Sequence, residues 1–100
     1  METSIKESKV NYKEIIREVL KELEGPLTYQ DVENIVVHSP THQRLFLMAI
    51  GTDEGKDVAQ IMIAVSITAN NKVKIEKNNT DLNLRDLLLE RGVPYADIVQ

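Results

Sequence analysis

Cysteine and tryptophan are absent from this chain of 100 residues, and aromatic side chains make up only 4% of it. Without cysteine the protein has no disulfide, no thiolate nucleophile and no cysteine-based zinc site. A domain of this length that lacks crosslinks depends on its core or on oligomerisation for stability. With so few aromatics, we expect that core to be aliphatic.

Long hydrophobic runs and an excess of basic residues are also missing. No apolar run approaches the roughly 20 residues of a membrane span. The polar start, with Glu2, Lys6, Glu7 and Lys9, is unlike a signal peptide, so we expect a soluble cytoplasmic protein. The formal net charge of −4 disfavours sequence-independent binding to nucleic acid, which depends on basic residues that neutralise phosphates.

The composition, 42% hydrophobic and 28% charged, is that of an ordinary globular protein. Residues 1–10 are predicted to form a polar leader, and residues 11–100 a single α+β domain. A first helix should begin after Asn11, whose side chain can cap the first turn, and should end at Gly25-Pro26. Its apolar residues recur at helical spacing: Tyr12, Ile15, Ile16, Val19, Leu20 and Leu23.

Strand signals follow the first helix. The predicted strands cover residues 32–38, 44–50, 58–69 and 72–77. The glycine-rich, acidic segment 51–57 should be a hairpin loop between the second and the third. In the third strand, alternation places Ile61, Ile63, Val65 and Ile67 on one face.

The last hairpin leaves its register open. A two-residue loop, Asn70-Asn71, would pair Ile67 with Lys74. A three-residue loop that ends in a left-handed Asn71 would instead pair Ile67 with Val73. Either the loop is bulged or the sheet is apolar on both faces.

The second strand favours a sheet with two apolar faces. Leu45 and Leu47 point one way, whereas Phe46, Met48 and Ile50 point the other way. One face would receive the helices, and the other would need a partner. We expect a homo-oligomer formed through this second sheet face; the alternative is a curved sheet that wraps its own core.

A second helix is predicted after Asn83 as N-cap, with leucines 84, 87 and 88 facing inward. Gly92 should supply a left-handed stop, and Pro94 forbids continuation and can start a further turn. Short connections between successive strands favour an antiparallel meander. The predicted fold is therefore α+β: a four-stranded antiparallel meander sheet with an N-terminal and a C-terminal helix packed on one face.

Candidate chemistry is sparse. His38 and His42 could share a metal, but Pro40 lies between them and no nearby carboxylate completes a familiar ligand set. Ser39 beside these histidines lacks a nucleophile elbow and an orienting carboxylate. The pair Asp31 and Glu33 is typical of surface charge rather than of an acid–base pair.

The glycines and Lys56 in the 51–57 loop are one residue short of phosphate-loop spacing, and acidic residues between them would repel phosphate. We therefore predict no catalytic, cofactor-binding or metal site. Lys72, Lys74 and Lys77 form the densest basic cluster. Lysines on a strand edge usually prevent edge-to-edge pairing. The alternative is a nucleic-acid contact that also uses Arg85 and Arg91.

The stretch NNTDLNLRDLLLERGVPYADIV, residues 78–99, resembles the end of the XisI family, which is named for the fdxN element excision controlling factor. That family typically shows a short strand, an N-G-T-E-like turn, a helix and G-V-P-x-x-D-I-V. The residues that fit are Asn78, Thr80, Leu89, Gly92, Val93, Pro94, Asp97, Ile98 and Val99.

The resemblance spans roughly residues 11–99. The first helix matches Y-x-x-I-I-x-x-x-L, and residues 29–33 match Y-x-D-V-E. Departures are Asn70-Asn71 in place of Asp-Gly, Thr52 in place of a tryptophan, and His38 in place of an aspartate. Family members usually continue past D-I-V with a His- and Pro-containing tail, whereas this sequence stops at Gln100, so no role of that tail is carried over.

The resemblance implies regulation rather than catalysis. Proteins of this family are similar in genomic setting to accessory factors that act with a second protein, XisH, in recombinase-driven excision of a DNA element in cyanobacteria. We therefore expect a non-enzymatic control factor with a XisH-like partner. The alternatives are a nucleic-acid-binding accessory protein that uses the lysine cluster, and a small-ligand or metal-binding module that uses His38 and His42.

Overall fold

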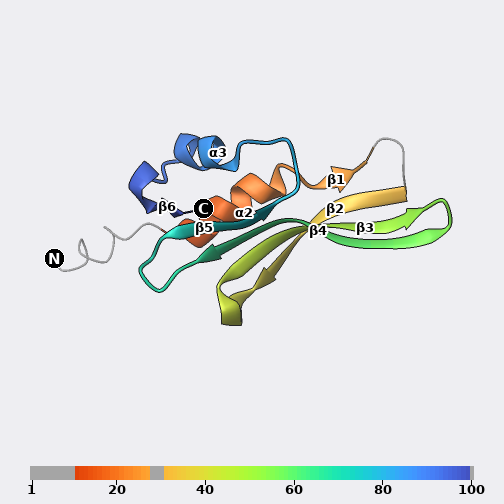
Figure 1. Cartoon of the computed structure of the whole chain (residues 1–100), viewed down its shortest axis with the longest axis horizontal. Coiled ribbons are helices and arrows are strands. Elements are labelled where there is room, and N and C mark those ends of the chain that lie inside the picture. Colours follow the sequence, from red (N-terminus) through yellow and green to blue (C-terminus); the bar gives the residue numbers. More distant parts are fainter. Residues whose placement is uncertain (1–10, 28–30, 100) are drawn as a thin grey trace.

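A computed structural model describes residues 11–27 and 31–99. The predicted polar leader, residues 1–10, lies outside the described residues, as does Tyr29. The elements in chain order are α2 (Tyr12–Lys21), β1 (Gly25–Pro26), β2 (Asp31–Ser39), a 3-10 helix (Pro40–His42), β3 (Arg44–Asp53), β4 (Lys56–Ile67), β5 (Val73–Asn78), α3 (Leu84–Glu90), a 3-10 helix (Tyr95–Asp97) and β6 (Ile98–Val99). Figure 1 shows both α-helices on the same side of a twisted sheet.

The described strands form one six-stranded sheet in the order β1-β2-β3-β4-β5-β6. Neighbours are antiparallel except β5 and β6, which are parallel. The α+β class is confirmed, but the prediction of a four-stranded, purely antiparallel sheet is wrong. Both additional strands have two residues, which is too short for any periodicity to show.

The first helix is capped as predicted, because the Asn11 side chain accepts a hydrogen bond from the Glu14 amide at 3.4 Å. The helix ends at Lys21, earlier than expected. Gly25-Pro26 therefore does more than stop it: these residues pair with Asn34 and Glu33 and start the sheet.

The hairpin between β3 and β4 is confirmed, but its loop is much shorter than residues 51–57. Only Glu54 and Gly55 lie between the strands, with φ of 53° and 80°. Gly51 belongs to β3, where a Cβ atom would lie 2.0 Å from the Asp31 carbonyl oxygen. A glycine is needed there because β2 and β3 approach so closely.

The last hairpin adopts the bulged alternative. Ile67 pairs with Val73, and Asn71 has a φ of 60°. The Thr68 amide donates to the Lys72 carbonyl at 2.8 Å, which leaves residues 69–71 as the loop. The three-residue loop is therefore the one that forms.

The C-terminal helix begins at its predicted cap, since the Asn83 side chain accepts from the Asp86 amide at 3.2 Å. Gly92 is left-handed, with a φ of 100°. The Val93 amide then donates to the Leu88 carbonyl at 3.1 Å, and the Val93 side chain is buried. The predicted stop is confirmed, and a 3-10 turn follows Pro94.

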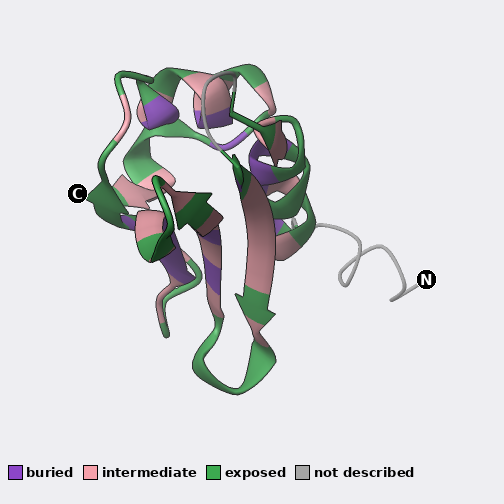
Figure 2. Cartoon of the chain, turned by 90° about the vertical axis from the view of Figure 1, so that its right-hand side faces the viewer, coloured by how far each residue is buried: buried purple, intermediate pink, exposed green. Residues whose placement is uncertain are grey.

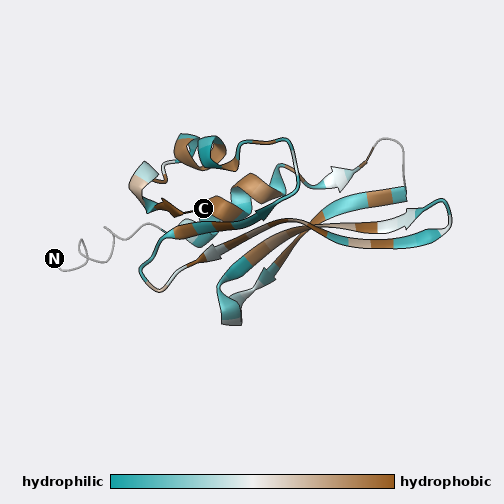
Figure 3. Ribbon diagram, in the orientation of Figure 1, coloured by the Kyte–Doolittle hydropathy of each residue, from teal (hydrophilic) through white to brown (hydrophobic). Residues whose placement is uncertain are grey.

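The core lies between the helices and one face of the sheet. Its buried members are Tyr12, Ile16, Val19, Leu20, Leu45, Leu47, Ile63, Val65, Val73, Ile75, Leu84, Leu88 and Val93. In Figure 2 the buried segments of the helices face the strands. Figure 3 shows hydrophobic residues along the middle of β3 and β4. Within the described chain, no helix has the length and apolar character needed to cross a membrane.

Candidate protein-interaction surface

The sheet face opposite the helices is apolar at its centre. Ile35 of β2 lies beside Met48 of β3, which lies beside Ile61 of β4. We call the set the open face; it comprises Ile35, Val37, Phe46, Met48, Ile50 and Ile61. Each of these side chains is only partly buried, and none belongs to the core between sheet and helices. From the sequence, we predicted only the β3 members of this face. The apolar run Ile35–Val37 could also have indicated Ile35 and Val37 of β2.

A β-bulge places Ile61 on the open face. Leu47 pairs with Ile63, but the next residue, Met48, pairs with Ile61, so that Met62 is the extra residue of β4. Ile63 is fully buried under the helices, and Met62 packs against the same core. The prediction that Ile61 and Ile63 share a face is therefore wrong, because the bulge reverses the alternation between them.

A polar pair borders the open face. Arg44 of β3 donates to Glu76 of β5 through Nε at 2.9 Å and Nη2 at 3.1 Å. These hydrogen bonds, more than the charge itself, raise the pKa of Arg44 and lower that of Glu76. The surface thus has an apolar centre and a charged rim, an arrangement common in protein interfaces.

The histidines lie at the strand end next to this face. Ser39 Oγ and His42 Nδ1 are 3.0 Å apart at an exposed position. His38 instead lines a groove between β2 and α2, together with Lys13 and Arg17. No group of three or more potential metal ligands occurs among the residues that the structure describes. Among these residues, the structure therefore adds no third ligand to His38 and His42.

The basic residues of the nucleic-acid hypothesis are not gathered in one place. Lys72 contacts Asp97 Oδ1 at 3.1 Å, and Arg91 pairs with Glu22 and Glu18. The Arg85 guanidinium lies 5.3 Å from the centre of the Tyr95 ring. Lys74 and Lys77 are exposed on β5. The cluster seen in the sequence is thus divided between structural ion pairs and the sheet surface.

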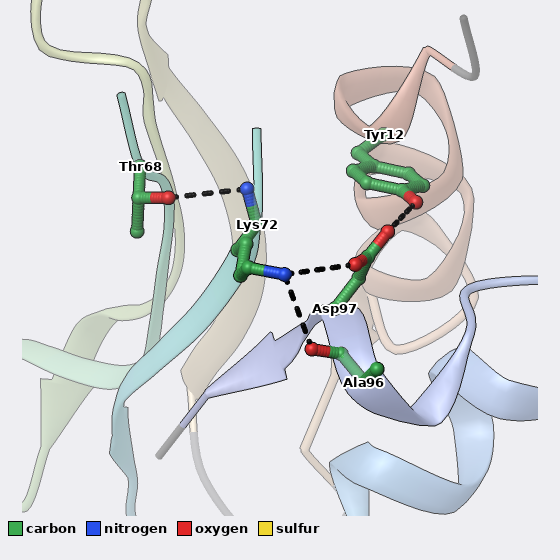
Figure 4. Close-up of polar contacts among 5 residues, drawn as sticks. All are labelled: Tyr12, Thr68, Lys72, Ala96 and Asp97. Carbon is green, nitrogen blue, oxygen red and sulfur yellow. Dashed lines mark hydrogen bonds and ion pairs between the residues drawn. The ribbon is translucent and has the colours of Figure 1, made fainter. Parts of the chain in front are cut away.

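Asp97, one of the residues that carry the family resemblance, has a structural role (Figure 4). It accepts a hydrogen bond from the Tyr12 hydroxyl of α2 and another from Lys72, whose Nζ also reaches the Ala96 carbonyl at 3.4 Å. The hydrogen bond to Asp97, assisted by burial, raises the pKa of Tyr12 to about 12, and the same bond lowers the pKa of Asp97. The contact joins the first helix to the C-terminal turn.

Asn78 organises the turn before α3. Its Oδ1 accepts from the Thr80 amide at 2.9 Å and from the Thr80 hydroxyl at 2.6 Å. Its Nδ2 donates to the Leu82 carbonyl at 2.8 Å. Like Asp97, these residues of the resemblance make hydrogen bonds that shape the chain.

Glu24 protects the outer edge of β2. Its carboxylate accepts from the Val36 amide at 2.8 Å and lies 3.2 Å from Lys21 Nζ. These two contacts, the amide first, lower the pKa of Glu24. A side chain that satisfies an edge amide discourages another strand from pairing there. The edge of β2 is thus less suited to a partner than the open face.

Comparisons with known proteins agree with this architecture. A XisI-like protein from Anabaena variabilis ATCC 29413 is 25% identical, with a TM-score of 0.75 over 89% of this chain and 82% of that one. The fdxN element excision controlling factor XisI from the same organism is also 25% identical, with a TM-score of 0.66 over 89% and 86% of the respective chains. No curated protein sequence matches the chain. The family model described as XisI protein matches residues 6–100, and this chain belongs to the XisI family.

Proposed function

We propose that this chain is a non-enzymatic control factor that acts through a XisH-like protein partner in the regulation of site-specific excision of a DNA element. The observation that carries the proposal is the open face, where apolar side chains of β2, β3 and β4 lie on the side of the sheet opposite the two described α-helices. An apolar centre with a charged rim suits protein–protein contact better than catalysis.

Three further observations support the proposal. Polar side chains within residues 78–99 hold the fold together, as the contacts of Asp97 and Asn78 illustrate. In addition, one relative is named as an fdxN element excision controlling factor, which is a regulatory rather than a catalytic description. The net charge of −4 also favours action through a protein over direct contact with DNA.

The test is a pull-down of the full chain with a co-encoded XisH-like protein at low and at moderate salt. We expect the two proteins to elute together under both conditions, since contact through an apolar surface survives moderate salt. If no partner is recovered at either salt concentration, the proposal fails. An excision assay in cells that lack this chain then asks whether the contact regulates excision.

A further inference from the structure

We infer that the open face is the contact between two copies of this chain; the inference rests on the proposed function only in treating this face as a protein-binding surface. The centre of the face offers apolar side chains from adjacent strands, with Met48 at the middle, between Ile35 and Ile61. Face-to-face packing of two sheets would remove these side chains from water.

Charge at the corners of the face argues for a second copy as the occupant. On the β2 side, Asp31 and Glu33 lie beside Thr52 and Ile50, and Asp57 continues the same row on β4. Strand alternation directs these acidic side chains to the open face. They form an acidic corner at the end of the sheet that carries the β3–β4 hairpin.

The opposite corner carries a net positive charge, because Glu76 there is already paired with Arg44 and two lysines remain. Lys74 lies beside Ser66, which in turn pairs with Arg44, and Lys77 lies beside Ala64. Both lysines are exposed. They are three residues apart, and the bulge at Glu76 in β5 is what places both of them beside open-face residues of β4. They are on the other side of the sheet from β2 and at the other end of the strands, so the basic corner is diagonal to the acidic one.

This diagonal arrangement is self-complementary. A two-fold axis that runs in the plane between two facing sheets, along the other diagonal, places the acidic corner of each copy over the basic corner of its partner. An axis along the acid–base diagonal would superimpose like charges. The favoured axis makes the strands of the two sheets cross at a steep angle, as in orthogonal sheet packing.

The first test is the mass of the full chain by analytical ultracentrifugation at micromolar concentration. We expect a dimer, and we expect Met48→Glu to raise its dissociation constant by about 100-fold or more, because an unpaired charge would be buried at the centre. Gln60→Glu is the matched control: it adds the same charge on the neighbouring strand β4, but Gln60 pairs with Ala49 on the other face. Circular dichroism confirms that both variants fold.

The second test reverses the corners. Lys74→Glu with Lys77→Glu gives one chain, and Asp31→Lys with Glu33→Lys gives another. Each alone should dimerise more weakly than the natural chain, whereas a mixture should form a 1:1 heterodimer in native mass spectrometry, because both corner contacts are then between opposite charges. Failure of the mixture to pair better than either chain alone overturns the proposed axis.

The outcomes separate this inference from the proposed function. A monomer that binds a XisH-like protein, and loses it on Met48→Glu, overturns the inference and leaves the proposed function standing. A dimer that recovers no XisH-like partner overturns the proposed function and leaves the inference standing. A dimer that tolerates Met48→Glu as well as Gln60→Glu uses another surface and also overturns the inference.

Discussion

The Tyr12 hydroxyl donates a hydrogen bond to Asp97, although the two residues are separated by 85 positions in the chain. Tyr12 is almost fully buried, and the carboxylate that it reaches also holds Lys72. Asp97 therefore connects α2, the start of β5 and the C-terminal turn at one point (Figure 4).

Tyr12→Phe keeps the ring in the core and removes the donor. We expect the free energy of unfolding to fall by about 1 kcal/mol, the usual contribution of such a hydrogen bond. Urea denaturation measures the change. Tyr95→Phe is the control, because Tyr95 is 66% exposed and its ring remains beside Arg85. Equal losses in both variants would contradict the role given to the Tyr12 hydroxyl.

The same pair predicts a dependence of stability on pH. The folded pKa of Asp97 lies below its ordinary value of 3.8, so its contribution is present above that value and is lost as the pH falls through the folded pKa. Tyr12 behaves in the opposite sense. Its pKa rises from 10.0 to about 12, so its contribution is complete below pH 10 and is lost as the pH rises toward 12. Asp97→Asn should flatten both slopes in thermal melts; unchanged slopes would refute the coupling.

Gly51→Ala should destabilise the protein by about 2 kcal/mol or more, because the new methyl group would collide with the Asp31 backbone and the residue has a φ of +150°. Gly55→Ala separates strain from collision: Gly55 also has a positive φ, but a Cβ atom there meets nothing within 4 Å. We expect a loss of about 1 kcal/mol for Gly55→Ala. Similar denaturation midpoints for the two variants would mean that the β2 backbone at Asp31 does not lie close to Gly51.

Two adjacent asparagines test the turn before α3. Asn78→Ala removes the side-chain hydrogen bonds to Thr80 and Leu82, and we expect a loss of about 1–2 kcal/mol in chemical denaturation. Asn79→Ala keeps the backbone hydrogen bond from Asn79 to Met62 and should cost much less. Asn78→Ala should therefore lose more stability than Asn79→Ala. A larger loss for Asn79→Ala would contradict the role given to the Asn78 side chain.

Direct nucleic-acid binding is expected to be absent even at low salt. Lys72 and Arg91 already face carboxylates and the Arg85 guanidinium lies over the Tyr95 ring, which leaves Lys74 and Lys77 too few to hold a phosphate backbone. A gel-shift assay with duplex DNA checks this expectation. A shift that weakens steeply with salt, and disappears when Lys74 and Lys77 become alanine, would support the nucleic-acid alternative instead.

Local chemistry made several elements predictable from the sequence. The caps at Asn11 and Asn83, the left-handed stop at Gly92 and the hairpin at Asn71 each depend on residues within a few positions of one another. Such features need no knowledge of the tertiary fold, and the structure confirms them.

Features that depend on the partner strand could not be predicted in this way. The bulge at Met62 changes which face Ile61 occupies, yet an unbroken alternation of apolar residues fits the sequence equally well. Likewise, Gly25-Pro26 is a strand only because Asn34 and Glu33 lie beside it. For the candidate surface, alternation in β3 was informative, whereas the diagonal placement of charges required the register of the whole sheet.

The parallel pairing of β6 with β5 has a consequence for folding kinetics. Val73 lies beside Ile98, and the adjoining Asp97 reaches Tyr12, so the sheet edge and the first helix are completed by the same late segment of the chain. Closing loops of this length is entropically costly, and long-range contacts slow the approach to the transition state. Substitutions at Tyr12 and Ile98 should therefore show whether this closure comes before or after the rate-limiting barrier. If it comes before, the loss of stability slows folding; if it comes after, the loss speeds unfolding.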